Sequence, residues 1–219
     1  IDYCKKLKNE KVDSIYLHFN GTTKTTNPLI ESHKKVIENC KKTNLNVVLN
    51  PIISSDKNLH EAGKIVRFAI DNSDSIRGIH FQLFFFDNRI FTANNYKREK
   101  RHYSYEKLLQ FIEQEYPNLI SRDDFYPYCF IFPISKFVES ITKDSQTALT
   151  AHPGCGGSTY IFIVDGKPIP LTRFIDVEAF MSFLADQSRK KGPLRKLRIA
   201  SSFMKNIDTF VDYQKAPYG

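Results

Sequence analysis

The sequence predicts an α/β fold with a parallel sheet in its N-terminal half, and three observations support this prediction. Three apolar, β-rich stretches, at residues 14–23, 44–53 and 75–86, are typical of buried parallel strands. One segment with helical periodicity lies between each consecutive pair of stretches. Polar residues lie at or near the end of each stretch, as expected where a parallel sheet presents side chains to a ligand. This alternation of strand and helix is that of βαβ units.

The composition indicates a globular protein with a basic surface. Of the 219 residues, 41% are hydrophobic, and the formal net charge is +8. Such a charge favours contact with nucleic acid, a phosphorylated substrate or membrane headgroups, although many lysine-rich enzymes are also basic. No signal peptide is evident, and no apolar run reaches the roughly 20 residues that span a bilayer. We therefore expect a cytoplasmic protein.

The first half of the chain contains the predicted strands and two amphipathic helices. Residues 1–12 have the pattern of a helix that leads into the first strand. Asn27 can cap the next helix, whose apolar stripe includes Cys40, interpreted as a small buried hydrophobe. His60 and Glu61 open the helix after the second strand, and we favour a solvated first turn over a substrate role. Three parallel strands alone would leave both sheet edges exposed, and the chain starts at Ile1 without methionine, so we expect a fragment.

The second half has a different composition and is predicted to be a small α+β domain. We place the division between residues 117 and 118, giving a partial barrel at 1–117 and a cap domain at 118–219. The basic, aromatic run 87–102 is interpreted as a solvated loop, and a helix is predicted over 104–116. A hairpin is predicted at 160–164 and 169–172 with its turn at Asp165 and Gly166. Asp176 is expected to cap a long helix, which a last amphipathic helix follows.

Three neutral amides near the ends of the predicted strands are the candidate cofactor-binding residues: Asn20, Asn50 and Gln82. Ligands of parallel sheets bind at the carboxyl ends of the strands, and amides suit ribose hydroxyls, an adenine edge or a carboxylate. Capping of the loops at that edge is the alternative. Amides do not act as general acids or bases, so no catalytic residue is assigned.

Cys155 and Cys129 are the candidate metal ligands. Cys155 lies in the glycine-rich sequence His152-Pro-Gly-Cys-Gly-Gly, which permits close approach of the backbone to a ligand. An iron–sulfur cluster requires about four thiolates, so further ligands would have to come from outside this segment. A structural Cys155, or a nucleophilic Cys155 assisted by His152, are the alternatives.

These residues together resemble the second half of a radical SAM barrel, and in particular the tetraether lipid synthase-like branch of that superfamily. The resemblance covers about residues 13–184 and rests on several motifs. They are Leu17-His-Phe-Asn-Gly-Thr-Thr, residues 37–53, Ile65-Val-Arg-Phe-Ala-Ile, Arg77-Gly-Ile-His-Phe-Gln, Asp124-Phe-Tyr-Pro, Pro133-Ile-Ser-Lys-Phe-Val-Glu, His152-Pro-Gly-Cys-Gly and residues 170–178.

The sequence departs from that branch at four points. Asn20 stands where the branch usually has aspartate, and Leu83 where it usually has proline. The Cys-x3-Cys-x2-Cys motif that binds the catalytic [4Fe–4S] cluster is absent, as is the glycine-rich strand that positions the methionine of SAM. By the resemblance, both would lie upstream of Ile1, and this segment alone would be inactive.

The resemblance implies an enzyme that cleaves S-adenosylmethionine (SAM) and abstracts hydrogen from an unactivated carbon, such as one in a lipid chain. It further implies a small-molecule or lipid substrate, a [4Fe–4S] cluster, and an electron donor such as ferredoxin or flavodoxin. A lipid substrate would bring peripheral contact with a membrane. The alternative is a catalytically silent binding module for an anionic partner such as RNA, with Lys97, Arg98, Arg101 and the basic stretch 189–198 as its contacts. We regard nucleic acid as the less favoured partner.

Overall fold

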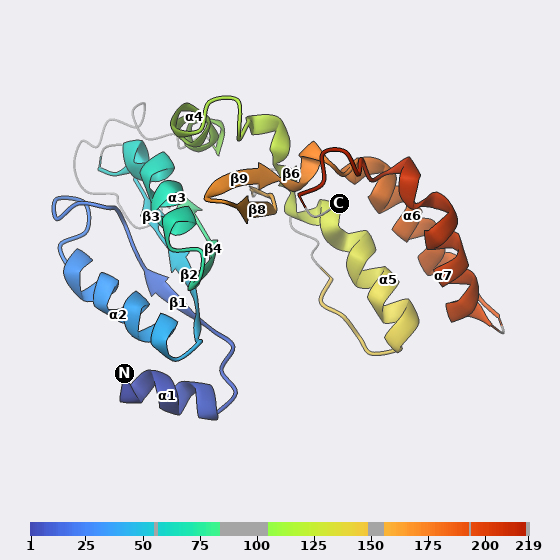
Figure 1. The fold of residues 1–219 in the computed structure, drawn as a ribbon, viewed down its shortest axis with the longest axis horizontal. Coiled ribbons are helices and arrows are strands. Elements are labelled where there is room, and N and C mark those ends of the chain that lie inside the picture. Colours follow the sequence, from blue (N-terminus) through green and yellow to red (C-terminus); the bar gives the residue numbers. More distant parts are fainter. Residues whose placement is uncertain (55–56, 84–104, 149–155, 193, 218–219) are drawn as a thin grey trace, which may run out of the picture. The chain divides into compact units, whose positions relative to one another are not determined.

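The computed structural model describes residues 1–54, 57–83, 105–148, 156–192 and 194–217 (Figure 1). The chain divides into two compact units: the first is Ile1–Arg122 with the short segment Asp165–Lys167, and the second is Asp123–Val164 with Pro168–Gly219. The sequence prediction placed this division at 117/118. Each unit is described by itself below. No helix in the described part of the chain is long and apolar enough to cross a membrane.

The first unit is a mixed α/β structure around a parallel sheet, which confirms the predicted fold class. Its three-stranded sheet has the order β1-β2-β4, and both pairs of neighbouring strands are parallel. The elements are α1 (Asp2–Asn9), β1 (Ser14–His18), α2 (Ile30–Lys42), β2 (Asn46–Asn50), β3 (Ile52–Ile53), α3 (Ala62–Asp71), β4 (Ile76–Ile79), β5 (Gln82–Leu83) and α4 (Tyr105–Glu115).

The short strands β3 and β5 prolong β2 and β4. Leu49 pairs with Ile79, and Ile52 pairs with Gln82, so the offset between the two strands stays at 30 residues. The hydrogen bonds continue between them, because the His80 amide donates to the Leu49 carbonyl at 2.8 Å. Asn50 therefore stands beside His80 in this continuous parallel pair.

Helices α2 and α3 cover one face of the sheet. Both crossovers step to the next strand in the same direction, and right-handed crossovers of this kind place their helices on the same side. Many of the residues on that side are almost fully buried, and Phe19 stacks on Phe68 of α3 with ring centroids 4.8 Å apart. The buried side of the sheet includes Phe19, Val47, Leu49, Pro51 and Ile53.

Two thiols meet where α1 packs against α2. The Sγ atoms of Cys4 and Cys40 lie 3.9 Å apart, and both side chains are buried. The prediction that Cys40 is a buried residue of the apolar stripe is therefore confirmed. Burial, together with the neighbouring Cys4 sulfur, raises the pKa of the Cys40 thiol to about 12.

The second unit packs helices around an aromatic core. Its elements are β6 (Tyr126–Pro127), α5 (Phe132–Thr142), β7 (Gly157–Ser158), β8 (Ile161–Val164), β9 (Lys167–Pro170), α6 (Val177–Arg189) and α7 (Arg195–Asn206). Val177, Met181 and Leu184 of α6 form the buried centre of this core. Partly buried phenylalanines, among them Phe183 and Phe203 at 4.7 Å between ring centroids, surround it.

Local sequence signals fix a hairpin turn and a helix cap in the C-terminal half of the chain. The predicted hairpin is present as β8 and β9, although its second strand begins at Lys167 and not at Ile169 as predicted. Its turn residues Asp165 and Gly166 both have positive φ angles, as a tight hairpin turn requires. The predicted cap is also confirmed, because the Ala179 amide donates to the Asp176 carboxylate at 2.9 Å. The two loops singled out in the sequence, around 87–102 and 150–155, fall mainly outside the described residues.

Candidate binding face of the parallel sheet

The face of the sheet opposite α2 and α3 carries the candidate functional residues. Strand pairing aligns them in rows that run across the sheet, because His18 pairs with Asn50 and Val48 pairs with Gly78. Nine positions form three rows: Tyr16–Val48–Gly78, His18–Asn50–His80 and Asn20–Ile52–Gln82. The side chains at most of these positions are exposed or half-buried, whereas the alternate positions form the core. We call these nine positions the open face.

The three amides predicted from the sequence all lie on the open face, in its two rows nearest the carboxyl ends of the strands. Asn20 has a structural contact, since its Oδ1 accepts a hydrogen bond from the Ile52 amide at 2.9 Å. This is the loop-capping role that the sequence left open. Gln82 is exposed, and Asn50 is half-buried. Binding of a cofactor by these residues stays a prediction.

Two histidines and a tyrosine join the amides on this face, and the sequence interpretation had missed them. His18 and His80 lie on either side of Asn50, and the rings of Tyr16 and His80 are 6.4 Å apart and nearly perpendicular. A sequence signal for them existed. Tyr16 and His18 alternate with apolar residues that face the helices, and a period of two indicates a strand with one open side. None of the nine positions is acidic, so the open face suits a neutral ligand with hydrogen-bonding groups.

Buried amides hold together the loops at the carboxyl ends of β1 and β2. Asn58, only 4% exposed, donates from Nδ2 to the carbonyls of Asn20 and Ile52, at 2.7 and 2.9 Å. Asn27 donates from Nδ2 to the Gly21 carbonyl at 3.1 Å. These bonds satisfy backbone groups that would otherwise be unpaired in a buried loop. The edge of the open face is therefore built from fixed loops.

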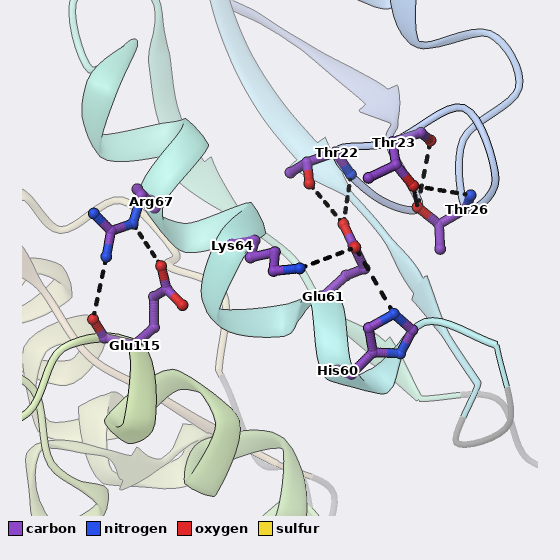
Figure 2. A network of polar contacts seen from close by, with 8 residues as sticks. All are labelled: Thr22, Thr23, Thr26, His60, Glu61, Lys64, Arg67 and Glu115. Atoms are coloured by element: carbon purple, nitrogen blue, oxygen red, sulfur yellow. Dashed lines mark hydrogen bonds and ion pairs between the residues drawn. The ribbon is translucent and has the colours of Figure 1, made fainter.

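Glu61 is the centre of a second network at this edge (Figure 2). Its Oε2 accepts two hydrogen bonds from Thr22, from the backbone amide at 2.8 Å and from the hydroxyl at 2.7 Å. Its Oε1 lies 3.7 Å from Lys64 Nζ and 3.8 Å from His60 Nε2. Glu61 thereby ties the start of α3 to the loop after β1.

The burial of Glu61 corrects the prediction of a solvated first turn. His60 is exposed as predicted, but Glu61 is only 2% exposed, because Thr22 from a distant part of the chain covers and binds it. Burial by itself raises the pKa of this carboxyl. The hydrogen bonds from Thr22 and the nearby Lys64 and His60 outweigh burial, and they hold the pKa of Glu61 below its usual range. Glu61 is therefore a buried carboxylate at neutral pH.

The cysteines present in the described residues do not fit an iron–sulfur cluster. Cys129 is partly exposed in the short 3₁₀ helix Tyr128–Ile131, and Cys4 and Cys40 are buried against each other. Across the described ranges, no group of three or more histidine, cysteine, aspartate or glutamate residues is placed to hold a metal ion. The other candidate ligand, Cys155, lies outside the described residues. Metal binding by Cys129 and Cys155 stays a prediction.

The fold is that of an α/β protein whose parallel sheet has one face covered by helices and one open face. The sequence matches no family model. It is 34% identical, over 227 aligned residues, to the 7,8-dihydro-6-hydroxymethylpterin dimethyltransferase of Methanocaldococcus jannaschii. The alignment covers 99% of this chain and 44% of that enzyme, so the chain spans less than half the length of the relative.

Proposed function

We propose that the chain is the substrate-side part of a radical SAM enzyme that methylates a pterin or a closely related heterocycle. The observation that carries the proposal is the similarity to a pterin dimethyltransferase at 34% identity along nearly the whole chain. The resemblance of the strand motifs to radical SAM barrels supports the same assignment independently.

The geometry of the first unit is compatible with this proposal. Strands that follow one another in order, with their helices on one side, are the arrangement that repeated βα units have in a barrel. The open face would then be part of the barrel interior. Its amides, imidazoles and phenol offer hydrogen bonds to a neutral heterocycle.

The cofactors of the proposed enzyme are SAM and a [4Fe–4S] cluster, reduced by a donor such as ferredoxin or flavodoxin. The described residues do not supply a cluster site. We place the cluster ligands in the portion of the full enzyme that corresponds to the other 56% of the relative. This chain would contribute the wall against which the substrate is held.

A lipid chain is the substrate that the tetraether lipid synthase-like resemblance suggested. The name of the relative favours a heterocycle instead. The two substrates are chemically so different that one assay separates them, and reductive cleavage of SAM is common to both proposals.

The test is substrate-dependent cleavage of SAM by the full-length protein. The protein is purified without oxygen, its iron and sulfide are reconstituted, and it is given SAM, dithionite and 7,8-dihydro-6-hydroxymethylpterin. We expect 5′-deoxyadenosine to form faster with the pterin than without it. Mass spectrometry should also detect a pterin product heavier by one or two methyl groups when a cell extract supplies any further methyl donor.

Three outcomes would overturn all or part of the proposal. Stimulation of SAM cleavage by an isoprenoid phospholipid, and not by the pterin, would move the assignment to lipid chemistry. No SAM cleavage with any substrate by a protein that contains its cluster would refute the radical SAM assignment. An RNA affinity that falls steeply as salt rises would favour the binding-module alternative, because phosphate contacts release counterions.

A further inference from the structure

Asn50 carries a buried hydrogen-bond acceptor that the described protein does not satisfy. Its Oδ1 is inaccessible to solvent and has no hydrogen-bond partner. Most buried polar atoms of folded proteins are paired, because an unpaired one loses its bonds to water and gains nothing in return. The other amides at this edge, Asn20, Asn27 and Asn58, all make hydrogen bonds. Asn50 is therefore an exception that requires an explanation.

The position of Asn50 places this acceptor at the centre of the open face. His18 pairs with Asn50 on one side, and His80 stands beside it on the other. Each imidazole can donate or accept a hydrogen bond, so the row presents three polar groups across neighbouring strands. Parallel strands are about 4.8 Å apart, which makes this row about as long as a two-ring heterocycle.

The row next to Asn50 provides a flat surface for such a ring. It consists of Tyr16, Val48 and Gly78. A Cβ atom at Gly78 would make only ordinary contacts with Val48, at 3.9 Å or more. A larger side chain would therefore fit here, and the glycine leaves the backbone at this position uncovered. Tyr16 is 67% exposed and stands at one end of the row. The rings of Tyr16 and His80 lie only 6.4 Å apart, and Asn50 Oδ1 is inaccessible to solvent, so a planar ligand on Val48 and Gly78 reaches Asn50 only when these two rings move apart.

We propose that Asn50 Oδ1 accepts a hydrogen bond from the amino-substituted edge of the pterin ring, with His18 and His80 on either side of that edge. This inference rests on the proposed function for the identity of the ligand. A pterin has a ring N–H and an exocyclic amino group side by side on one edge, and these are the donors that an unpaired carbonyl oxygen requires. The absence of acidic residues at the nine positions fits this neutral ring.

The experiment measures binding without turnover. Dissociation constants for 7,8-dihydro-6-hydroxymethylpterin and for SAM are determined with the full-length, cluster-containing protein in the absence of reductant. The variant is Asn50→Leu, and the matched control is Asn46→Leu, a change to another half-buried asparagine at the opposite end of the same strand. Asn50→Asp keeps an acceptor oxygen and guards against a leucine variant that fails to fold. The ligand-side control is a pterin analogue without the amino group.

We expect Asn50→Leu to weaken pterin binding about tenfold, the effect of one lost hydrogen bond. SAM binding should be unchanged, Asn46→Leu should bind as the wild type, and Asn50→Asp should bind better than Asn50→Leu. The analogue should bind the wild type and Asn50→Leu equally. Equal pterin binding by the wild type and Asn50→Leu, or a loss confined to SAM, would overturn the inference alone. Failure of the wild type to bind any pterin would overturn the proposed function as well.

Discussion

Replacing Glu61 with alanine is the sharpest test of the network at the edge of the open face. The substitution removes the acceptor of two hydrogen bonds from Thr22, at 2.8 and 2.7 Å, and leaves both donors without this partner. The interactions with Lys64 and His60 contribute little, because both of these side chains are more than half exposed. The loss should therefore come from Thr22.

Glu61→Ala should lower the free energy of unfolding by about 3 kcal/mol, which is the lower end of the range for losing two hydrogen bonds to a charged group. The lower end applies because Thr22 is only half-buried, so water can bond to its freed donors. A loss of this size corresponds to a fall in Tm of about 10 °C for a chain of this length. Glu61→Gln keeps an acceptor without the charge and should lose less. Thr22→Val should cost little more in a Glu61→Ala background, because the hydroxyl has already lost its partner.

Urea unfolding followed by circular dichroism measures these differences. The control is Glu38→Ala, which removes an exposed carboxylate of α2 that pairs with Lys42 and should leave the unfolding midpoint unchanged. Since the folded pKa of Glu61 is lowered, its contribution to stability is present above its ordinary pKa and is lost as the pH falls through the folded value. The wild type and Glu61→Gln should thus converge in acid. A cost below about 1 kcal/mol for Glu61→Ala would refute the role of this carboxylate as a structural tie.

Three further predictions concern other parts of the chain. The Cys40 thiol, whose pKa is raised to about 12, should resist iodoacetamide at pH 8 until the protein unfolds. Because the folded pKa is raised, the stability that this thiol contributes should be lost as the pH rises from its ordinary pKa toward 12. Rapid labelling of the folded protein would contradict both expectations. Gly63→Ala should lower Tm, because the new alanine Cβ would lie 2.6 Å from the Phe111 carbonyl oxygen of α4. An unchanged Tm would mean that α3 and α4 can move apart at little cost in free energy. Asp176→Ala should cost about 1 kcal/mol through loss of the cap of α6, measured by thermal unfolding, with Asp176→Asn as the conservative variant that retains most of it.

The elements of the fold were predictable because each depends on local patterns. The apolar stripe of α2, the cap at Asp176 and the turn at Asp165 and Gly166 are set by residues within a few positions of one another. These local signals agree with the final structure, so the alternation of strand and helix in the first unit could be predicted from the sequence.

The site was predictable only in part, because its decisive contacts join distant residues. Glu61 is buried by Thr22, which is 39 positions earlier, and Cys4 meets Cys40 across 36 positions. Nothing near Glu61 in the sequence indicates this burial, so a charged residue in a first helical turn was expected to be solvated. His18 and His80 were missed for a related reason, since only the register of the strands brings them to either side of Asn50.

The alternation of open and buried positions along the strands has a consequence for how this protein can change. Open-face and core positions alternate along the same strands, with His18 next to Phe19 and Asn50 next to Leu49. Point substitutions at the nine positions of the open face can alter ligand preference while the packing beneath them stays intact. Insertion or deletion of one residue would exchange the two sets and put imidazoles and amides against α2 and α3. New specificities in such a sheet should therefore arise by substitution at every second residue, with length changes confined to the loops.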